Sequence, residues 1–171
     1  LRLPEPDLHL GVGSGSHAQQ TGQVMMAYEK ILIEQQPDLV VVVGDVNSTM
    51  AVTIAATKLG TKVAHLEAGL RSFDRTMPEE INRLVTDSLA DLLWTPSPDG
   101  DANLLREGVA RDKIVRVGNI MIDSLEMLRE TIESQETTGA FDVQSKSFGL
   151  ITLHRPSNVD DPGTLEKICT F

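Results

Sequence analysis

Ionisable side chains follow several apolar runs of this 171-residue sequence, at the points where those runs end. Asp45 comes shortly after LVVVV, Glu67 directly after KVAHL, and His154 directly after FGLITL. If the runs are parallel strands, their carboxyl ends share the sheet edge at which α/β folds bind ligands. Carboxylates and an imidazole gathered there could act as general acids and bases. The polar residues that follow predicted strands are Asp45, Glu67, Arg71, Asn119, His154 and Arg155.

A second group of charges lies where a loop meets the helix expected to begin at Pro78, and it includes Glu79 and Glu80. Carboxylates in a first helical turn are favoured by the helix dipole, which explains Glu80 without any chemistry. Asp45 could in the same way cap the next helix. Glu67 ends a strand and precedes Ala-Gly, so no cap explains it. The structural interpretation is therefore weakest for Glu67.

The histidines give a weaker signal. A single histidine such as His154 is more often structural than catalytic, but carboxylates at matching strand ends favour a functional cluster. His65 is expected in the core. The spacing His65-x-Glu67 has no further ligand at a suitable distance, so no metal site is predicted. His9 and His17 show no pattern.

The elements that must position these residues alternate along the chain. The continuous β-branched run at 39–43 is typical of a strand buried on both faces of a parallel sheet. Short connections between strands and helices predict an α/β fold with a Rossmann-like parallel sheet and helices on both faces. The expected strands are 39–43, 62–66, 92–95, 114–117 and 148–153, and the expected helices 20–35, 49–59, 78–90, 101–107, 120–132 and 162–170.

The same pattern predicts a domain division. Residues 1–132 read as an incomplete N-terminal Rossmann-like domain, and the polar, aperiodic residues 133–147 as a linker. Residues 148–171 offer only a strand and a helix, which cannot form a core of their own. We therefore expect them to be the start of a second Rossmann-like domain, and the chain to be part of a longer protein.

Composition narrows the choice of partners and compartment. The formal net charge of -10 argues against nucleic acid and anionic membrane, which both attract basic surfaces. The amino-terminal residues do not resemble a signal peptide, and the lone Cys169 cannot form an intrachain disulfide, so a cytoplasmic protein is expected. The glycine-rich residues 11–15 lack the dinucleotide fingerprint and are interpreted as a flexible loop.

The sequence resembles a known family at its most polar segment. HLEAGLRSFD at 65–74 and MPEEINR at 77–83 resemble the central signature of the non-hydrolysing UDP-N-acetylglucosamine 2-epimerases. The similarity extends to Gly44-Asp45, to VGNIMID at 117–123 and to TLHRPSNV at 152–159. The order and spacing of these segments agree over most of the chain.

The resemblance implies a glycosyltransferase-B-like architecture, in which two Rossmann-like domains face each other across a cleft. It also implies a cytoplasmic, homodimeric enzyme that prepares precursors of surface polysaccharides. Such enzymes interconvert UDP-GlcNAc and UDP-ManNAc without metal or nicotinamide cofactor. They eliminate UDP to give 2-acetamidoglucal and add it back with inversion at C2.

The residues matching the family's catalytic groups are Asp45, Glu67, Glu79 and His154; Arg71, Asn119 and Arg155 are carried over as contributors to substrate binding or to site architecture. Gln19 stands where some bacterial members carry an arginine for an activating second UDP-GlcNAc, so that activation is not expected here. Two other functions stay open: a glycosyltransferase of the same architecture, and an inactive or binding-only fragment.

Overall fold

The computed structural model describes residues 4–135, 141, 143–144, 147–154 and 156–170. Its contacts divide the chain into two units, Leu1–Ser124 and Leu125–Phe171, which are described separately. The strands are β1 (Leu39–Val43), β2 (Lys62–Leu66), β3 (Leu92–Thr95) and β4 (Ile114–Arg116), and the helices α1 (His17–Gln35), α2 (Asn47–Lys58), α3 (Pro78–Leu89), α4 (Pro98–Arg106), the 3-10 turn η1 (Arg111–Lys113), α5 (Ile120–Glu133), α7 (Pro156–Val159) and α8 (Pro162–Cys169).

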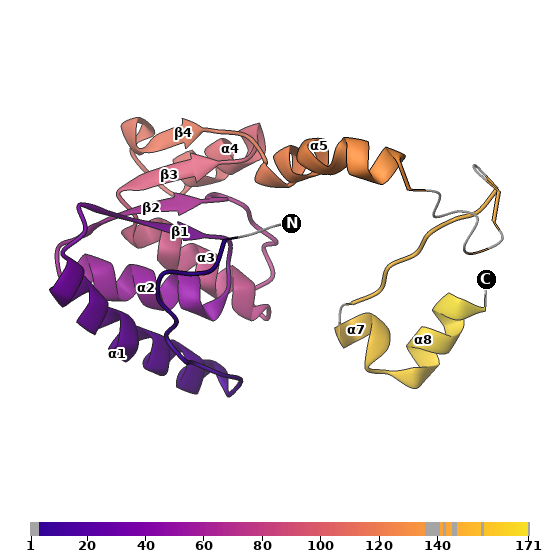
Figure 1. Cartoon of the computed structure of the whole chain (residues 1–171), viewed down its shortest axis with the longest axis horizontal. Coiled ribbons are helices and arrows are strands. Elements are labelled where there is room, and N and C mark those ends of the chain that lie inside the picture. Colours follow the sequence, from indigo (N-terminus) through magenta and orange to yellow (C-terminus); the bar gives the residue numbers. More distant parts are fainter. Residues whose placement is uncertain (1–3, 136–140, 142, 145–146, 155, 171) are drawn as a thin grey trace. The chain divides into compact units, whose positions relative to one another are not determined.

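The first unit is built on one parallel sheet, which confirms the predicted α/β class. Its strands run in the order β1-β2-β3-β4 (Figure 1). Val42 is paired with His65, and His65 in turn with Leu93. Because all the strands point the same way, the loops that leave β1 and β2 open at the same edge of the sheet.

The helices between the strands cover one face of this sheet. Right-handed crossovers that all step in one direction place their helices on the same side. In Figure 1, α2 and α3 lie along one side of the strands, and α1 lies beyond α2. Accordingly, Val40 and Val42 are buried, whereas Leu39, Val41 and Val43 are 37–47% exposed.

The prediction that β1 is buried on both faces is therefore wrong for this chain. A β-branched run indicates a strand, but what covers its second face depends on other segments. The expectation of helices on both faces holds for one face within the described residues. The core on that face consists of Leu32, Val40, Val42, Ala55, Ala56, Val63, Ala68, Ala90, Leu93 and Leu104.

Helices α1 and α4 begin earlier than apolar periodicity predicts, because side-chain caps extend them. Ser16 accepts a hydrogen bond from the Gln19 amide and forms a reciprocal capping box, so α1 begins at His17. Ser97 accepts from the Gly100 amide and starts α4 at Pro98. The glycine-rich residues 11–15 thus lead directly into a capped helix.

In the second unit, α7 and α8 are in contact with each other. The strand predicted over 148–153 does not form: residues 148–154 have neither helical nor strand structure. Phe148, Leu150 and Ile151 are 50–84% exposed. A strand needs a neighbour for its backbone hydrogen bonds, and the described part of this unit contains no other strand.

Candidate active site

Glu67 has an unusual backbone conformation at the end of β2. Its φ is 75°, in the left-handed region that a residue with a side chain seldom adopts. The amides of Glu67 and Ala68 both donate to the carbonyl of Trp94, at 3.1 Å each, which holds this turn against β3. Such a conformation costs about 1–3 kcal/mol and is typical of functional sites.

The side chain of Glu67 lies beside the end of β1. A Cβ atom placed on Gly44 would be 3.4 Å from Oε2 of Glu67, so the carboxylate lies against the turn that precedes Asp45. Gly44 has φ 69°, a conformation that glycine adopts without strain. The predicted convergence of Asp45 and Glu67 at one sheet edge is therefore present at the level of their loops.

Asp45 is held by α3 through both its backbone and its side chain. Nδ2 of the Asn82 side chain donates to the Asp45 backbone carbonyl at 2.8 Å. Nη1 of Arg83 donates to Oδ2 of Asp45 at 2.5 Å. Asp45 does not cap α2, whose N-cap is Val46 and has no side-chain cap, so the structural alternative for Asp45 is wrong.

Glu80, next to the predicted Glu79, is a buried anchor for the loop before α3. Its carboxylate, 2% exposed, accepts from the amides of Ser72 and Phe73 at 3.0 Å each and from the Arg83 guanidinium. Burial alone would raise the pKa of Glu80, but the hydrogen bonds from Ser72, Arg83 and Phe73 outweigh it and lower the pKa to about 2. The helix dipole is thus only part of the reason for Glu80.

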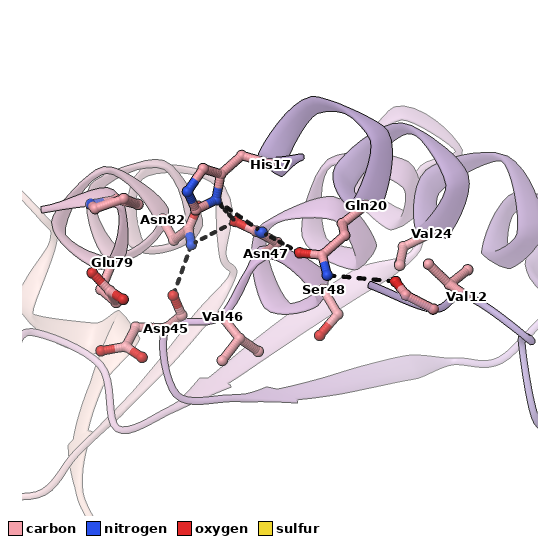
Figure 2. Close-up of a pocket in the computed structure, with 12 residues that line it drawn as sticks. Val12, His17, Gln20, Val24, Asp45, Val46, Asn47, Ser48, Glu79 and Asn82 are labelled. Atoms are coloured by element: carbon pink, nitrogen blue, oxygen red, sulfur yellow. Dashed lines mark hydrogen bonds between the residues drawn. The ribbon is translucent and has the colours of Figure 1, made fainter. Parts of the chain in front are cut away.

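Asp45 and Glu79 line one pocket of about 390 Å³, shown in Figure 2. Glu79 is exposed, and its carboxylate lies near Asp45 in this view. The amino end of α2 also faces the pocket. The lining residues are Val12, Gly13, His17, Gln20, Val24, Asp45, Val46, Asn47, Ser48, Pro78, Glu79 and Asn82.

A hydrogen-bonded chain of polar side chains lines this pocket, and sequence analysis missed it. Asn47 donates to Oε1 of Gln20 at 2.8 Å, and Asn82 donates to Oδ1 of Asn47 at 3.3 Å. Nδ1 of His17 lies 3.2 Å from Oδ1 of Asn47. These residues come from α1, α2 and α3, and only packing of the helices brings them together. In the sequence, only Asn82 could have pointed to this chain of contacts, because it lies within the PEEINR segment. Its side chain is buried in the structure.

Arg71 is buried and held by two carboxylates. Its side chain is 1% exposed and is bonded to Asp87 at 2.7 Å and, through two nitrogens, to Glu107. Burial disfavours the charged guanidinium, but Glu107 and Asp87 outweigh this and raise the pKa of Arg71. With its donors engaged by carboxylates, Arg71 supports the architectural alternative rather than direct substrate binding.

Asn119, in the same unit as this pocket, is not among the residues that line it. Oδ1 of Asn119 accepts from the Met121 amide at 2.9 Å, so this side chain caps the start of α5. His154 is exposed and belongs to the second unit, and Arg155 lies outside the described residues.

Two broader features are absent from the described part of the chain. No helix there is long and apolar enough to cross a membrane. The described histidine, cysteine, aspartate and glutamate side chains form no group of three that could hold a metal ion.

The whole sequence, residues 1–171, matches the protein family described as UDP-N-acetylglucosamine 2-epimerase. A UDP-N-acetylglucosamine 2-epimerase of Methanocaldococcus jannaschii is 45% identical over 171 residues, which cover 98% of this chain and 47% of that protein. The UDP-2,3-diacetamido-2,3-dideoxy-D-glucuronate 2-epimerase of Pseudomonas aeruginosa is 43% identical, with the same coverage. The chain spans about half the length of these curated relatives.

Solved structures agree with the sequence comparison. The crystal structure of the M. jannaschii UDP-GlcNAc 2-epimerase in complex with UDP-GlcNAc and UDP matches with a TM-score of 0.85 and 45% identity. The match covers 98% of this chain and 46% of that one. From a match along its whole length, and from strand-end carboxylates grouped at one sheet edge, we conclude that this chain belongs to the UDP-N-acetylglucosamine 2-epimerase family.

Proposed function

We propose that the protein containing this chain interconverts UDP-GlcNAc and UDP-ManNAc by the non-hydrolysing route. The observation that carries the proposal is the pairing of Asp45 and Glu79 in one pocket, with the strained Glu67 beside the turn that precedes Asp45. The family match supports it, as does the similarity to the M. jannaschii structure in complex with UDP-GlcNAc and UDP.

The chemistry requires at least two acid–base groups around the C2 carbon. In the elimination step, a base removes the C2 proton while the C1–oxygen bond to UDP breaks, which leaves 2-acetamidoglucal. In the return step UDP re-adds at C1 and a proton is delivered to the opposite face of C2. Asp45, Glu67 and Glu79 are the carboxylates proposed for these transfers. Arg83 would keep Asp45 oriented, because it holds one carboxylate oxygen and leaves the other free.

The departing UDP needs positive or donor groups that stabilise its charge. The amino end of α2, which lacks a side-chain cap and faces the pocket, offers a field that favours an anion. His154 and Arg155 are proposed as further contributors from the second unit.

The domain division is also part of the proposal. Residues 1–132 form an incomplete N-terminal Rossmann-like domain, residues 133–147 a linker, and residues 148–171 the start of a second Rossmann-like domain.

A second substrate has comparable support. The relative named UDP-2,3-diacetamido-2,3-dideoxy-D-glucuronate 2-epimerase is 43% identical, against 45% for the M. jannaschii enzyme. Both names describe epimerisation at C2 of a UDP-sugar. Identity at this level does not discriminate between the two sugars, so the second one is kept as an alternative substrate.

The deciding experiment follows the C2 proton. The protein, at the length its native cells produce, is incubated with each UDP-sugar in heavy water, and the C2 position is followed by NMR. Deuterium at C2 together with the epimeric product supports the proposal and identifies the sugar. Absence of C2 exchange with both sugars contradicts it, and transfer of the sugar to an acceptor would indicate a glycosyltransferase. The 171-residue chain in the same assay tests whether it is active alone.

Compartment and assembly follow from the family resemblance and are proposed with the function: a cytoplasmic homodimer. UDP-sugars are expected in the cytoplasm, and the lone Cys169 fits a compartment that does not require disulfides. Sedimentation of the purified protein and fractionation of native cells test these two points separately.

A further inference from the structure

Asp87 is a buried carboxylate that the proposed reaction does not use. It lies on α3, and the residue is 3% exposed. Its Oδ1 lies 2.6 Å from Nδ1 of His65. Its Oδ2 accepts from the Gly69 amide at 3.0 Å and from Nη1 of Arg71 at 2.7 Å. Removing a charge from water is costly unless hydrogen bonds and ion pairs compensate for it. We therefore look for the role of Asp87 in the groups to which it is bonded.

One of these contacts leads to the end of β1. His65 is fully buried, and its second ring nitrogen, Nε2, lies 2.8 Å from the carbonyl oxygen of Gly44. Asp87 is thereby linked through a single imidazole to the residue that directly precedes Asp45. The sequence-based interpretation of His65 as a core residue is right about its burial but misses this bridge.

A second contact of Asp87 leads to the end of β2. Gly69 lies two residues after Glu67, and its amide is bonded directly to Asp87. The far side of this turn is closed by α4: the Asn103 side chain donates to the Gly69 carbonyl at 3.0 Å. A Cβ atom on Gly69 would collide with the backbone of Gly100. A strained residue such as Glu67 keeps its conformation only when the neighbouring structure enforces it.

We propose that Asp87 is a positioning residue, which fixes the Asp45 turn through His65 and the Glu67 turn through Gly69. One carboxylate thus sets the distance between two turns that carry proposed acid–base groups. Proton transfer at C2 requires such groups within hydrogen-bond reach of one carbon, and a misplacement of about 1 Å can cost about 100-fold in rate. The inference rests on the proposed epimerisation, and it assigns Asp87 no contact with substrate.

The test compares Asp87→Asn with Asp91→Asn. Asp91 also accepts a backbone amide, that of Val63 at 2.9 Å, but at the amino end of β2. Asp87→Asn is expected to lower kcat by about 100-fold, with KM changed by less than about threefold, because the substrate contacts remain. Asp91→Asn is expected to keep kcat near the wild-type value. Equal kcat values for the two variants would overturn the proposal.

A double-mutant cycle with His65→Gln separates positioning from general loss of stability. If both residues act through one chain of contacts, the double variant should be little slower than Asp87→Asn alone. Losses that multiply would contradict the link. If Asp87→Asn does not fold, His65→Gln alone tests the link from Asp87 to Gly44, because it leaves the bond from Asp87 to Gly69 in place. An unchanged kcat for His65→Gln would overturn the claim that Asp87 positions the Asp45 turn.

A spectroscopic readout keeps this test distinct from that of the proposed function. If the wild-type protein turns over neither UDP-sugar, the proposed function fails. The positioning claim is then decided by amide NMR of the folded variants. Asp87→Asn should shift the resonances of Asp45 and Glu67, and Asp91→Asn should leave them in place. Unshifted resonances in Asp87→Asn would refute the claim without any activity assay.

Discussion

The Nη1 atom of Arg83 lies 2.5 Å from Oδ2 of Asp45, so a proposed catalytic carboxylate is held by a guanidinium from α3. The Nη2 atom of the same guanidinium lies 2.8 Å from Oε2 of the buried Glu80. Arg83 itself is only 11% exposed at its side chain. A planar guanidinium can serve two carboxylates at once, which the single nitrogen of a lysine cannot do in the same geometry.

Replacing Arg83 by Lys should therefore separate charge from geometry. The variant keeps the positive charge but loses the fork, and we expect it to fold while activity falls about 10- to 100-fold because Asp45 loses its orientation. Turnover assays measure the loss of activity, and urea unfolding checks that the variant remains folded. The matched control is Arg129→Lys, which alters an exposed ion pair with Glu126 and should change neither quantity. Wild-type turnover in Arg83→Lys would contradict the role given to Arg83.

Glu80 should make the stability of the protein depend on pH in the acidic range. Its pKa is about 2 in the folded state, against an ordinary value of 4.5. Because the folded pKa is depressed, the stabilisation is complete above about pH 4.5 and is lost as the pH falls toward 2. The difference between the folded and the ordinary pKa corresponds to a contribution on the order of 3 kcal/mol to the free energy of unfolding.

The measurement is urea unfolding of the wild type and of Glu80→Gln between pH 7 and pH 2.5. The wild type should lose more stability over this interval than the variant, whose residue 80 does not titrate. Parallel curves for the two proteins would show that Glu80 does not have the low pKa that its hydrogen bonds imply.

Most of the fold could be predicted because its signals are local. The β-branched run of β1 and the glycines that follow helices are properties of a few neighbouring residues. Helix starts were less accurate where a serine cap adds a turn, as Ser16 and Ser97 do. The exposed face of β1 and the irregular residues 148–153 depend on what covers them, which no local pattern records.

The candidate site divides in the same way. Asp45 and Glu67 could be found because a residue that follows a parallel strand must lie at one edge of the sheet. His17 and Gln20 could not, because α1 precedes the first strand and reaches the pocket only by packing on α2. Arg71 follows a strand, as a substrate-binding residue would, but its burial between Asp87 and Glu107 depends on tertiary packing.

Gly69 should tolerate no side chain. Its φ is 81°, and an added Cβ would meet the backbone of Gly100, which cannot move aside as a flexible side chain could. Gly69→Ala should therefore destabilise the protein by several times the ~1 kcal/mol that strain at a single backbone position costs. Gly22→Ala in α1 is the control: a Cβ there meets no atom within 4 Å, and alanine is the better helix former. A melting temperature for Gly69→Ala at or above that of Gly22→Ala would show that the contact with Gly100 has been misjudged.

Glu67 offers a test of whether strain is retained for function. Glu67→Gln keeps the shape and the left-handed backbone, and should lower turnover by orders of magnitude with little change in stability. Glu67→Ala and Glu67→Gly both remove the carboxylate, but only glycine relaxes at φ 75°. We expect Glu67→Gly to be more stable than Glu67→Ala by about 1 kcal/mol, although both are inactive. Thermal unfolding and C2 exchange on the same samples measure the two effects. Near-normal epimerisation by Glu67→Gln would remove Glu67 from the chemistry, and equal stability of the glycine and alanine variants would mean that the turn after β2 stores no strain.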